Sequence, residues 1–325
     1  MTGEFYITNT KPTLMRTTVT ILIGLFALSI PSAEAQELIN KNIYLLQLEQ
    51  NDSAYQVTTA SFLSSFNSSG TNDHPSFLSE NKIYLSSSLK KNGFDELDIF
   101  ELNLTSKEKI QITETVENEL HPKASPDAYY FTAIREEADV DRTKRLWKFP
   151  VFVKHEKDMG KPLFPYIGGI ENYEWVNRSI AALVVEAENS NRLFLGKVSD
   201  NSTMFVASDV GTCIQKKNNS NNIYYLDKSF SNKWMIKEAI LSGNNKEDID
   251  IQSIDQIESL AGQNYFGVLP NNQLISAKGS KLYIYDPKNS EKGWSEIVDL
   301  GPLNITNIES IDVSNRLQLL LVTKD

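Results

Sequence analysis

Two short phrases in the sequence place acidic residues, a histidine and a proline in a similar order. They read "NDHP" at residues 72–75 and "NELHP" at residues 118–122. Carboxylates beside an imidazole can bind a metal cation or the cationic group of a partner protein. The alternative is structural: each histidine hydrogen-bonds a neighbouring stretch of backbone and fixes a turn. On that alternative both histidines should be buried.

The common signatures of catalysis are missing from the sequence. There is no G-x-S-x-G elbow of a serine hydrolase and no glycine-rich phosphate loop. The phrase "HEKDM" at residues 155–159 lacks the second histidine of a zinc-protease motif, and only three histidines occur in all. We therefore expect no resident cofactor, although a cation such as calcium could occupy a channel lined by carboxylates.

The cysteine content and the net charge exclude an intramolecular disulfide and argue against two classes of partner. Cys213 is the single cysteine, so no intramolecular disulfide can form, and we expect a small, buried, apolar side chain there. The 325-residue chain is 40% hydrophobic and 23% charged, with a formal net charge of −10. Nucleic acids and anionic lipid surfaces attract basic proteins, so we expect neither as a partner.

The first residues resemble an export signal. An apolar run at residues 19–30 follows Lys11 and Arg16, and Ala33 and Ala35 stand where a signal peptidase reads small side chains. The run is shorter than the ~20 residues that span a bilayer. We expect residues 1–35 to be a signal peptide, with a possible true start at Met15. The mature chain then has no transmembrane segment and is periplasmic or secreted.

The elements that position the candidate residues are predicted to be strands. Short runs rich in β-branched and aromatic residues alternate with clusters of Asn, Ser, Gly, Asp and Lys, a pattern typical of strands and turns. After His74 and again after His121 the chain repeats a similar series of four strands, and weaker copies begin near Tyr173, Ile214 and Gly262. The spacing is typical of β-propeller blades, which repeat every ~40–50 residues.

The two ends of the chain supply half a repeat each. Residues 308–323 contain only two strands, whereas residues 42–49 and 54–59 match the third and fourth strands of a copy. Pairing of residues 42–49 with residues 317–323 would complete a shared blade and leave no free sheet edge. The sequence therefore predicts one all-β domain over residues 36–325, a six-bladed β-propeller of four-stranded antiparallel blades.

The repeat resembles that of TolB-like six-bladed β-propellers, which have WD40-like repeats. The residues that carry the resemblance are the His-Pro steps, the "SPDA" turn at residues 125–128 and the third strand "DIFELNL" at residues 98–104. The turn lacks the glycine that is usual in that family. The resemblance implies an exported, non-catalytic, monomeric ring that binds a protein or peptide of the bacterial cell envelope. The alternative is a propeller enzyme, such as a metal-dependent lactonase or a lyase, with its site in the channel.

In a propeller, the turns that enter the inner strands open onto one mouth of the central channel. The candidate ligand or partner residues in these turns are Asp73, His74, Glu119, His121, Glu171 and Asn172. Clustered carboxylates raise one another's pKa unless a cation offsets them, and their field should help the histidines to hold a proton. We therefore expect an acidic patch that binds a cation or a basic segment, more weakly at high salt.

A second candidate partner surface is the aromatic insertion that follows "RLWKFP". Phe152, Phe164 and Tyr166 lie there among prolines and glycines. Aromatic side chains dominate the energetics of many interfaces, so an extended loop that presents them could contact a partner. The alternative is a long turn whose aromatic residues pack between blades.

Overall fold

The computed structural model describes residues 40–51, 54–88, 96–151, 160–231, 233–242 and 250–324. The chain divides into two compact units, Met1–Glu37 and Leu38–Asp325, and every described residue belongs to the second unit. The predicted signal peptide and Phe152 lie outside the described residues. Within the described part, no helix has the length and apolar character that crossing a membrane requires.

Strands make up nearly all of the regular structure, as the sequence predicted. Two four-stranded antiparallel sheets come first: β3 (Asn72–Ser79), β4 (Lys82–Ser88), β5 (Leu97–Asn103) and β6 (Lys109–Gln111), then β7 (Asn118–Ala124), β8 (Tyr130–Glu136), β9 (Lys144–Pro150) and β10 (Lys161–Pro162). A third four-stranded sheet contains β18 (Gly267–Val268), β19 (Leu274–Lys278), β20 (Lys281–Tyr285) and β21 (Ser295–Asp299). In the described part of the chain, three short 3₁₀ helices lie in connections: Ser65–Asn67, Pro287–Lys292 and Gly301–Leu303.

Between the second and third of these sheets the chain forms one seven-stranded sheet. Its strands are β11 (Ile170–Asn177), β12 (Ile180–Glu186), β13 (Asn191–Lys197), β14 (Thr203–Lys216), β15 (Ile223–Asp227), β16 (Met235–Ser242) and β17 (Asp250–Glu258). The first part of β14 pairs with β13 and the last part pairs with β15, with a register shift between Val210 and Ile214. Asp209 has a left-handed backbone (φ +56°) at the adjacent register shift between β13 and β14, where Val210 lies opposite Asn191 and Ser208 opposite Arg192. One long strand therefore serves two groups of four strands.

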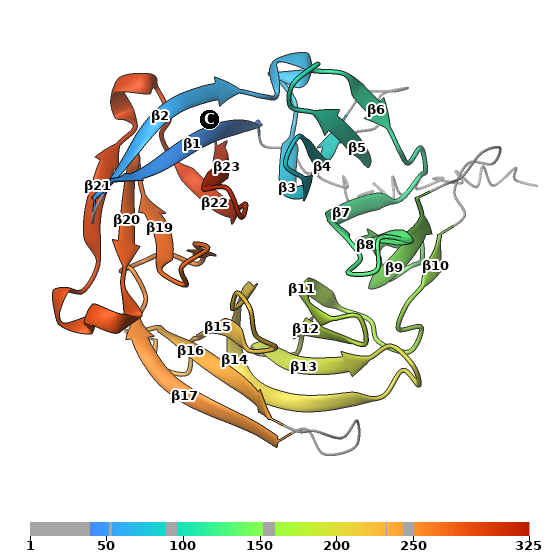
Figure 1. The fold of residues 1–325 in the computed structure, drawn as a ribbon. Coiled ribbons are helices and arrows are strands. Elements are labelled where there is room, and N and C mark those ends of the chain that lie inside the picture. The colour runs from blue at the N-terminus through green and yellow to red at the C-terminus, as the bar shows by residue number, and fades with distance from the viewer. Residues whose placement is uncertain are drawn as a thin grey trace, which may run out of the picture. The chain divides into compact units, whose positions relative to one another are not determined.

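The remaining sheet joins the two ends of the described chain. Its order is β2–β1–β23–β22, where β1 is Lys41–Asn51, β2 is Ala54–Phe62, β22 is Ile308–Val313 and β23 is Gln318–Lys324. The β1–β23 register runs from Lys41 opposite Lys324 to Gln47 opposite Gln318. The pairing of these two segments is the one that their strand patterns predicted. Figure 1 shows the first strands of the chain beside the last.

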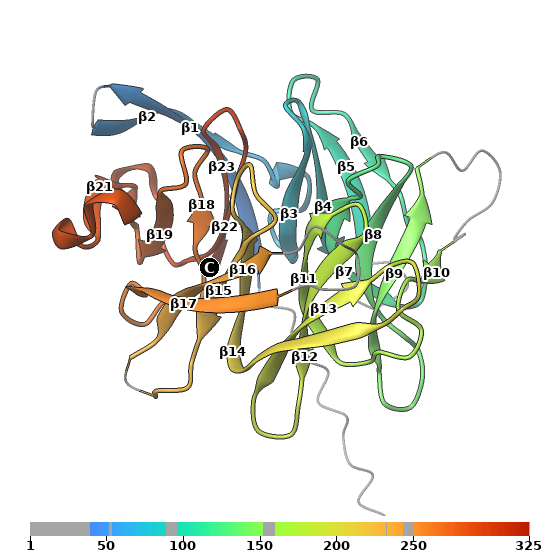
Figure 2. The same cartoon turned by 60° about the horizontal axis from the view of Figure 1, so that its bottom comes forward.

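Within the second unit the sheets stand around a common axis, with β3, β7, β11 and β22 near it (Figure 1). Figure 2 shows the same strands from a tilted direction. The described residues form six apolar clusters, and five of them fill the space between two different sheets. The sixth lies within the seven-stranded sheet, between its β11–β13 part and its β14–β16 part. A middle strand of these sheets is covered on both faces by adjacent sheets. Successive residues of β4 and β12 are therefore nearly all buried, instead of alternating between buried and exposed.

Candidate functional site

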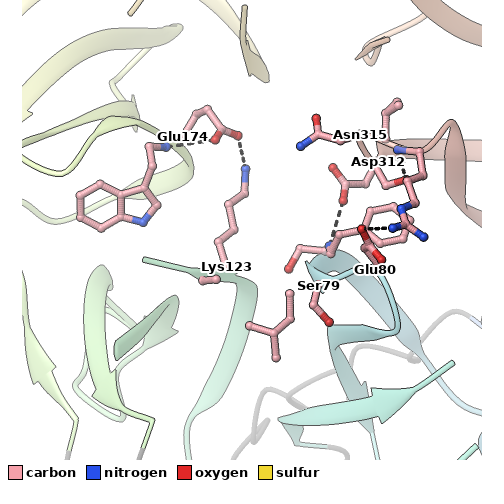
Figure 3. A pocket seen from close by; sticks show the side chains of 14 residues that line it. Ser79, Glu80, Lys123, Glu174, Asp312 and Asn315 are labelled. Carbon is pink, nitrogen blue, oxygen red and sulfur yellow. Dashed lines mark hydrogen bonds and ion pairs between the residues drawn. The ribbon is translucent and has the colours of Figure 1, made fainter. Parts of the chain in front are cut away.

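Two adjoining cavities lie between the inner strands. The first, here the channel cavity, has a volume of about 320 Å³ and is lined from β1, β3, β7, β11, β14 and β22 together with the segment before β18. The second, here the mouth cavity, has a volume of about 440 Å³ and is lined by the far ends of β3, β7, β11 and β22 (Figure 3). Ser76, Lys123 and Asp312 line both cavities, so these three side chains mark the waist between them.

The His-Pro steps are β-bulges in the inner strands. Register shifts fall between Asp73 and Ser76 in β3 and between Leu120 and Lys123 in β7. His74 and His121 have left-handed backbones, with φ values of +49° and +52°. That conformation is strained for a residue other than glycine, and a following proline disfavours helical backbone further. Because a bulge re-aims side chains, both imidazoles turn toward the channel cavity.

The structure brings five of the six candidate residues of the channel mouth to one cavity. They are Asp73, His74, His121, Glu171 and Asn172. Most of their charge is compensated within the chain. The Lys41 ammonium lies 2.7 Å from Asp73 Oδ2 and 3.0 Å from Glu309 Oε2, and the Lys144 ammonium lies 2.9 Å from Glu171 Oε1.

The neighbours of Asp73 favour its ionised form. Burial alone would raise its pKa, but interactions with His74 and Lys41 outweigh burial and hold the pKa of Asp73 below its usual value. The His74 backbone N–H donates to Asp73 Oδ1 at 2.8 Å. Lys41 is thus the cation that offsets the neighbouring carboxylates at Asp73.

The two histidines form a stacked pair. Their ring centroids are 3.7 Å apart and the ring planes are inclined by 41°. Burial lowers the pKa of His74, and burial together with the neighbouring His74 and lysines lowers the pKa of His121 well below its usual value. The prediction that these histidines hold a proton more readily than free histidine is therefore wrong. The prediction did not take desolvation into account. Burial lowers the pKa of His74 more than the nearby Asp73 carboxylate raises it.

Glu119 does not reach the channel, contrary to the prediction. It precedes the bulge of β7, and its fully buried carboxylate lies between two sheets. Arg135 Nε donates to Glu119 Oε1 at 3.0 Å, and the hydroxyls of Thr113 and Thr115 donate to the carboxylate at 2.9 and 2.7 Å. Burial raises the pKa of Glu119 to about 7 despite these partners. Glu119 thus belongs to a buried polar contact between the β3–β6 sheet and the β7–β10 sheet.

Several channel groups were not singled out from the sequence, among them Lys123, Glu174 and Asp312. Lys123 pairs with Glu174 on one side of the waist (Figure 3). On the other side, Asp312 accepts the Phe77 backbone N–H at 3.2 Å, and burial raises the pKa of Asp312 to about 6. Lys123 follows His121 by two residues, as Ser76 follows His74, so the repeat itself offered a signal for this position.

A series of contacts links each inner strand to the next at the level of the bulges. The Ser76 hydroxyl donates to the Pro122 carbonyl, the Tyr173 hydroxyl lies 2.9 Å from the His121 carbonyl, and the Asn172 amide donates to the Thr212 carbonyl at 2.8 Å. The Phe266 N–H contacts Cys213 Sγ at 3.4 Å, the Tyr265 hydroxyl donates to the Ile308 carbonyl, and the Phe77 N–H donates to Asp312. As expected, Cys213 is buried, and burial raises its pKa to about 12.

The aromatic insertion is divided between core and surface. Phe164 is fully buried in a cluster with Leu146 and Tyr173, and its ring lies so close to Gly196 that a β-carbon there would approach Phe164 Cζ to 2.7 Å. The prediction that Phe164 contacts a partner is therefore wrong, because the ring fills the space between two sheets. Tyr166 is 92% exposed and is available for contact.

No grouping of three or more His, Cys, Asp or Glu side chains suited to a metal ion occurs among the described residues. A comparison with known proteins gives no match to a family model and none to a curated protein sequence. Solved structures, in contrast, match over most of the chain. A putative TolB from Agrobacterium tumefaciens matches with a TM-score of 0.58 and 8% identity over 88% of this chain and 99% of that one.

The fold is that of TolB-like β-propellers. TolB from Acinetobacter baumannii matches with a TM-score of 0.53 and 11% identity, over 86% of this chain. This chain spans 63% of that protein's length. A chain from a nidogen/laminin complex matches with a TM-score of 0.55 and 11% identity, over 87% of this chain and 98% of that one. Structural similarity at such low sequence identity establishes the fold alone. The function therefore has to be inferred from the residues of the channel.

Proposed function

We propose that this chain is an exported, non-catalytic, six-bladed propeller whose channel cavity receives a cationic group of a partner polypeptide of the bacterial cell envelope. Export rests on the sequence pattern of residues 1–35. Two of the similar structures are named TolB, and a third comes from a complex of two proteins, which supports a role in protein binding. A rigid ring that presents polar groups at its axis suits such a role.

Three observations support six blades and a closed ring. The seven-stranded sheet counts as two blades that share β14, and the four other sheets supply one blade each. Six apolar clusters correspond to six contacts between neighbouring blades. The polar contacts between inner strands return from Asp312 to Phe77 and so complete a circuit. In this proposal β1 and β2 are the third and fourth strands of the last blade.

The charge of the channel cavity carries the functional proposal. Among the described residues that line it, four carboxylates, from Asp73, Glu171, Glu309 and Asp312, face two lysines. Among the residues that the structure describes, no lysine lies within ion-pair distance of Asp312, and Lys123 is paired with Glu174. A guanidinium or ammonium group that enters from either cavity could form an ion pair with Asp312. This ion pair would offset part of the cost of burying the carboxylate away from water. The neutral imidazoles that line the same cavity can accept hydrogen bonds from such a group.

Binding of a basic probe tests this proposal. The affinity of a nona-arginine peptide, with a nona-glutamate peptide as the comparison, is measured by isothermal titration for the full chain without residues 1–35. We expect the double variant Glu309→Gln/Asp312→Asn to weaken binding of the basic peptide at least tenfold. Asp200→Asn, which removes an exposed carboxylate on a turn, should leave the affinity unchanged. Equal affinities for the two variants would contradict a cationic site in the channel.

The enzyme alternative requires a different result. A metal-dependent lactonase or lyase needs several oxygen or nitrogen ligands that converge on one cation. Among the described residues, no group of three or more His, Cys, Asp or Glu side chains is arranged to hold a metal ion. Thermal melting with added calcium and with EDTA separates the two functions. A melting temperature that rises with calcium and falls with EDTA would favour the enzyme, whereas unchanged melting favours the binding module.

A further inference from the structure

The contact between the β3–β6 sheet and the β7–β10 sheet differs from the other contacts around the axis. It is here called the β3/β7 seam. Its apolar cluster, with Tyr84, Ile99, Phe131, Ala133 and Phe149 as the buried members, is the smallest of the six among the described residues. The seam also contains the buried Glu119–Arg135 pair, and the stacked histidines lie at its channel end. Ionisable groups thus replace part of the apolar packing.

The stacked histidines are held together by a strained backbone. His74 belongs to β3 and His121 to β7, so the ring contact of 3.7 Å joins the two sheets directly. Both residues are left-handed and precede proline, a conformation that persists only where the surroundings impose it. His74 Nδ1 is buried and has no hydrogen-bond partner among the described residues. Two positive charges at this separation would repel strongly in a poorly solvated site.

We propose that the β3/β7 seam is an acid-sensitive latch, in which protonation of both His74 and His121 drives the stacked rings apart and loosens the contact between the two sheets. The proposal does not depend on what the channel cavity binds. It depends on the ring contact, the strained backbone and the small apolar cluster.

The charged groups around the pair leave little negative charge free to balance two imidazolium rings. They are Lys41, Asp73, Lys123, Lys144, Glu171, Glu309 and Asp312. Asp73 and Glu309 are paired with Lys41, and Glu171 is paired with Lys144. Asp312 accepts the Phe77 backbone N–H and is not among the charges that shift the pKa of His74. Asp73 Oδ2 is 3.8 Å from His74 Nε2, which is too long for a hydrogen bond. The charges that shift the pKa of His121 most are those of His74 and three lysines, and all of them lower it.

The direction of the pH effect follows from the lowered pKa of both histidines. The unfolded chain takes up protons as the pH falls below about 6.5, whereas the folded chain resists them, so the histidine contribution destabilises the fold on acidification. Glu119 and Asp312 act in the opposite direction, since their pKa values are raised to about 7 and about 6. A comparison of histidine variants with the wild type therefore isolates the latch from these carboxyl groups.

The test uses urea unfolding and amide hydrogen exchange between pH 7.5 and pH 5.5. The latch variant is His74→Asn/His121→Asn, because asparagine tolerates a left-handed backbone and gains no charge. The control is His155→Asn, which replaces the third and last histidine of the sequence. We expect the wild type to lose up to tenfold in its folding equilibrium constant per histidine and per pH unit below 6.5, relative to the double variant. Amide protection in β3 and β7 of the wild type should fall before protection in β12 and β13.

Two results would overturn the proposal. The first is the same pH dependence of stability in the wild type and the double variant. The second is a loss of protection on acidification that is as large in β12 and β13 as in β3 and β7. Should the double variant fail to fold, His121→Asn alone answers the question. A single variant that keeps the full acid sensitivity of the wild type refutes the latch, and one that loses a measurable part of it supports the latch.

Discussion

Replacement of Arg135 by methionine should destabilise the fold strongly, whereas the same replacement of Arg142 should not. The two arginines make similar contacts with glutamates in the same sheet. Arg135 Nε lies 3.0 Å from Glu119 Oε1, and Arg142 Nε lies 3.1 Å from Glu136 Oε1. The pairs differ in burial, because the side chains of Arg135 and Glu119 are 3% and 0% exposed and those of Arg142 and Glu136 are 60% and 21% exposed. The comparison of Arg135→Met with Arg142→Met therefore tests how burial changes the contribution of an ion pair to stability.

The expected magnitudes follow from solvation. Removal of one partner of a buried ion pair leaves a charge without compensation and costs ~3–5 kcal/mol. Arg135 also lies over the ring of Trp147, at 4.4 Å from its centroid, and methionine replaces that contact only in part. An exposed pair such as Arg142–Glu136 contributes ~0–1 kcal/mol, since water replaces the lost partner. We therefore expect the free energy of unfolding to fall by ~3–5 kcal/mol for Arg135→Met and by less than ~1 kcal/mol for Arg142→Met.

The cost of Arg135→Met should also depend on pH. The pKa of Glu119 is raised to about 7 with Arg135 present, and removal of the arginine raises it further. At pH 6 the carboxyl group of the variant can take up a proton and escape the unpaired charge, whereas at pH 8 it holds its proton less readily. The penalty should therefore shrink on acidification, by at most ~1.4 kcal/mol per pH unit. Arg142→Met should show no such change.

Urea unfolding of the wild type and both variants at pH 8 and pH 6, followed by tryptophan fluorescence, measures these differences. Equal effects of the two substitutions at pH 8 would contradict a role for burial. An Arg135→Met penalty that grows as the pH falls would show that Glu119 is not the group left unpaired.

Three further predictions concern closure, inter-sheet contacts and the thiol. Deletion of residues 40–62 should leave β23 as a free apolar edge and produce aggregation that light scattering detects, whereas a stable monomer would contradict the pairing of the chain ends. Tyr173→Phe should lower the free energy of unfolding by ~1–2 kcal/mol because the buried hydroxyl contacts carbonyl oxygens of the adjacent sheet, and Tyr166→Phe should be neutral in the same denaturation assay. Cys213 should react with a disulfide reagent at neutral pH only after unfolding, because burial raises its pKa to about 12, so rapid modification of the native protein would be the contrary result.

The strands and their grouping could be predicted from the sequence because the repeat carries the information locally. The stretch after His74 and the stretch after His121 share turn residues and strand lengths, and the half-repeats at the two ends are complementary. Both histidines could also be assigned to a common channel, since equivalent positions in a repeat occupy equivalent places around an axis.

The partners of the candidate residues could not be predicted in the same way. A bulge inserts one residue into the two-residue period of a strand, so it decides whether a side chain faces the axis or a neighbouring sheet. Glu119 precedes the bulge and is buried, whereas His121 lies in it and faces the channel. The pairing of Lys41 with Asp73 and Glu309 joins three distant segments of the chain, and no local pattern reports such a contact. The lowered pKa of the histidines depends on burial, which is likewise a property of the assembled fold.

The pairing of β1 with β23 has a consequence for the order of folding events. These strands lie at opposite ends of the described chain, so their sheet cannot form until nearly the whole chain is available. The entropic cost of closing a loop rises by only ~0.6 kcal/mol for each doubling of its length. The large separation of β1 and β23 should therefore slow folding more than it lowers stability. A two-stranded hairpin such as β1–β2 is marginally stable by itself in water. A chain that emerges gradually from a ribosome or a translocon would thus carry this hairpin unprotected until β23 emerges, and chaperones would have their longest opportunity to bind there.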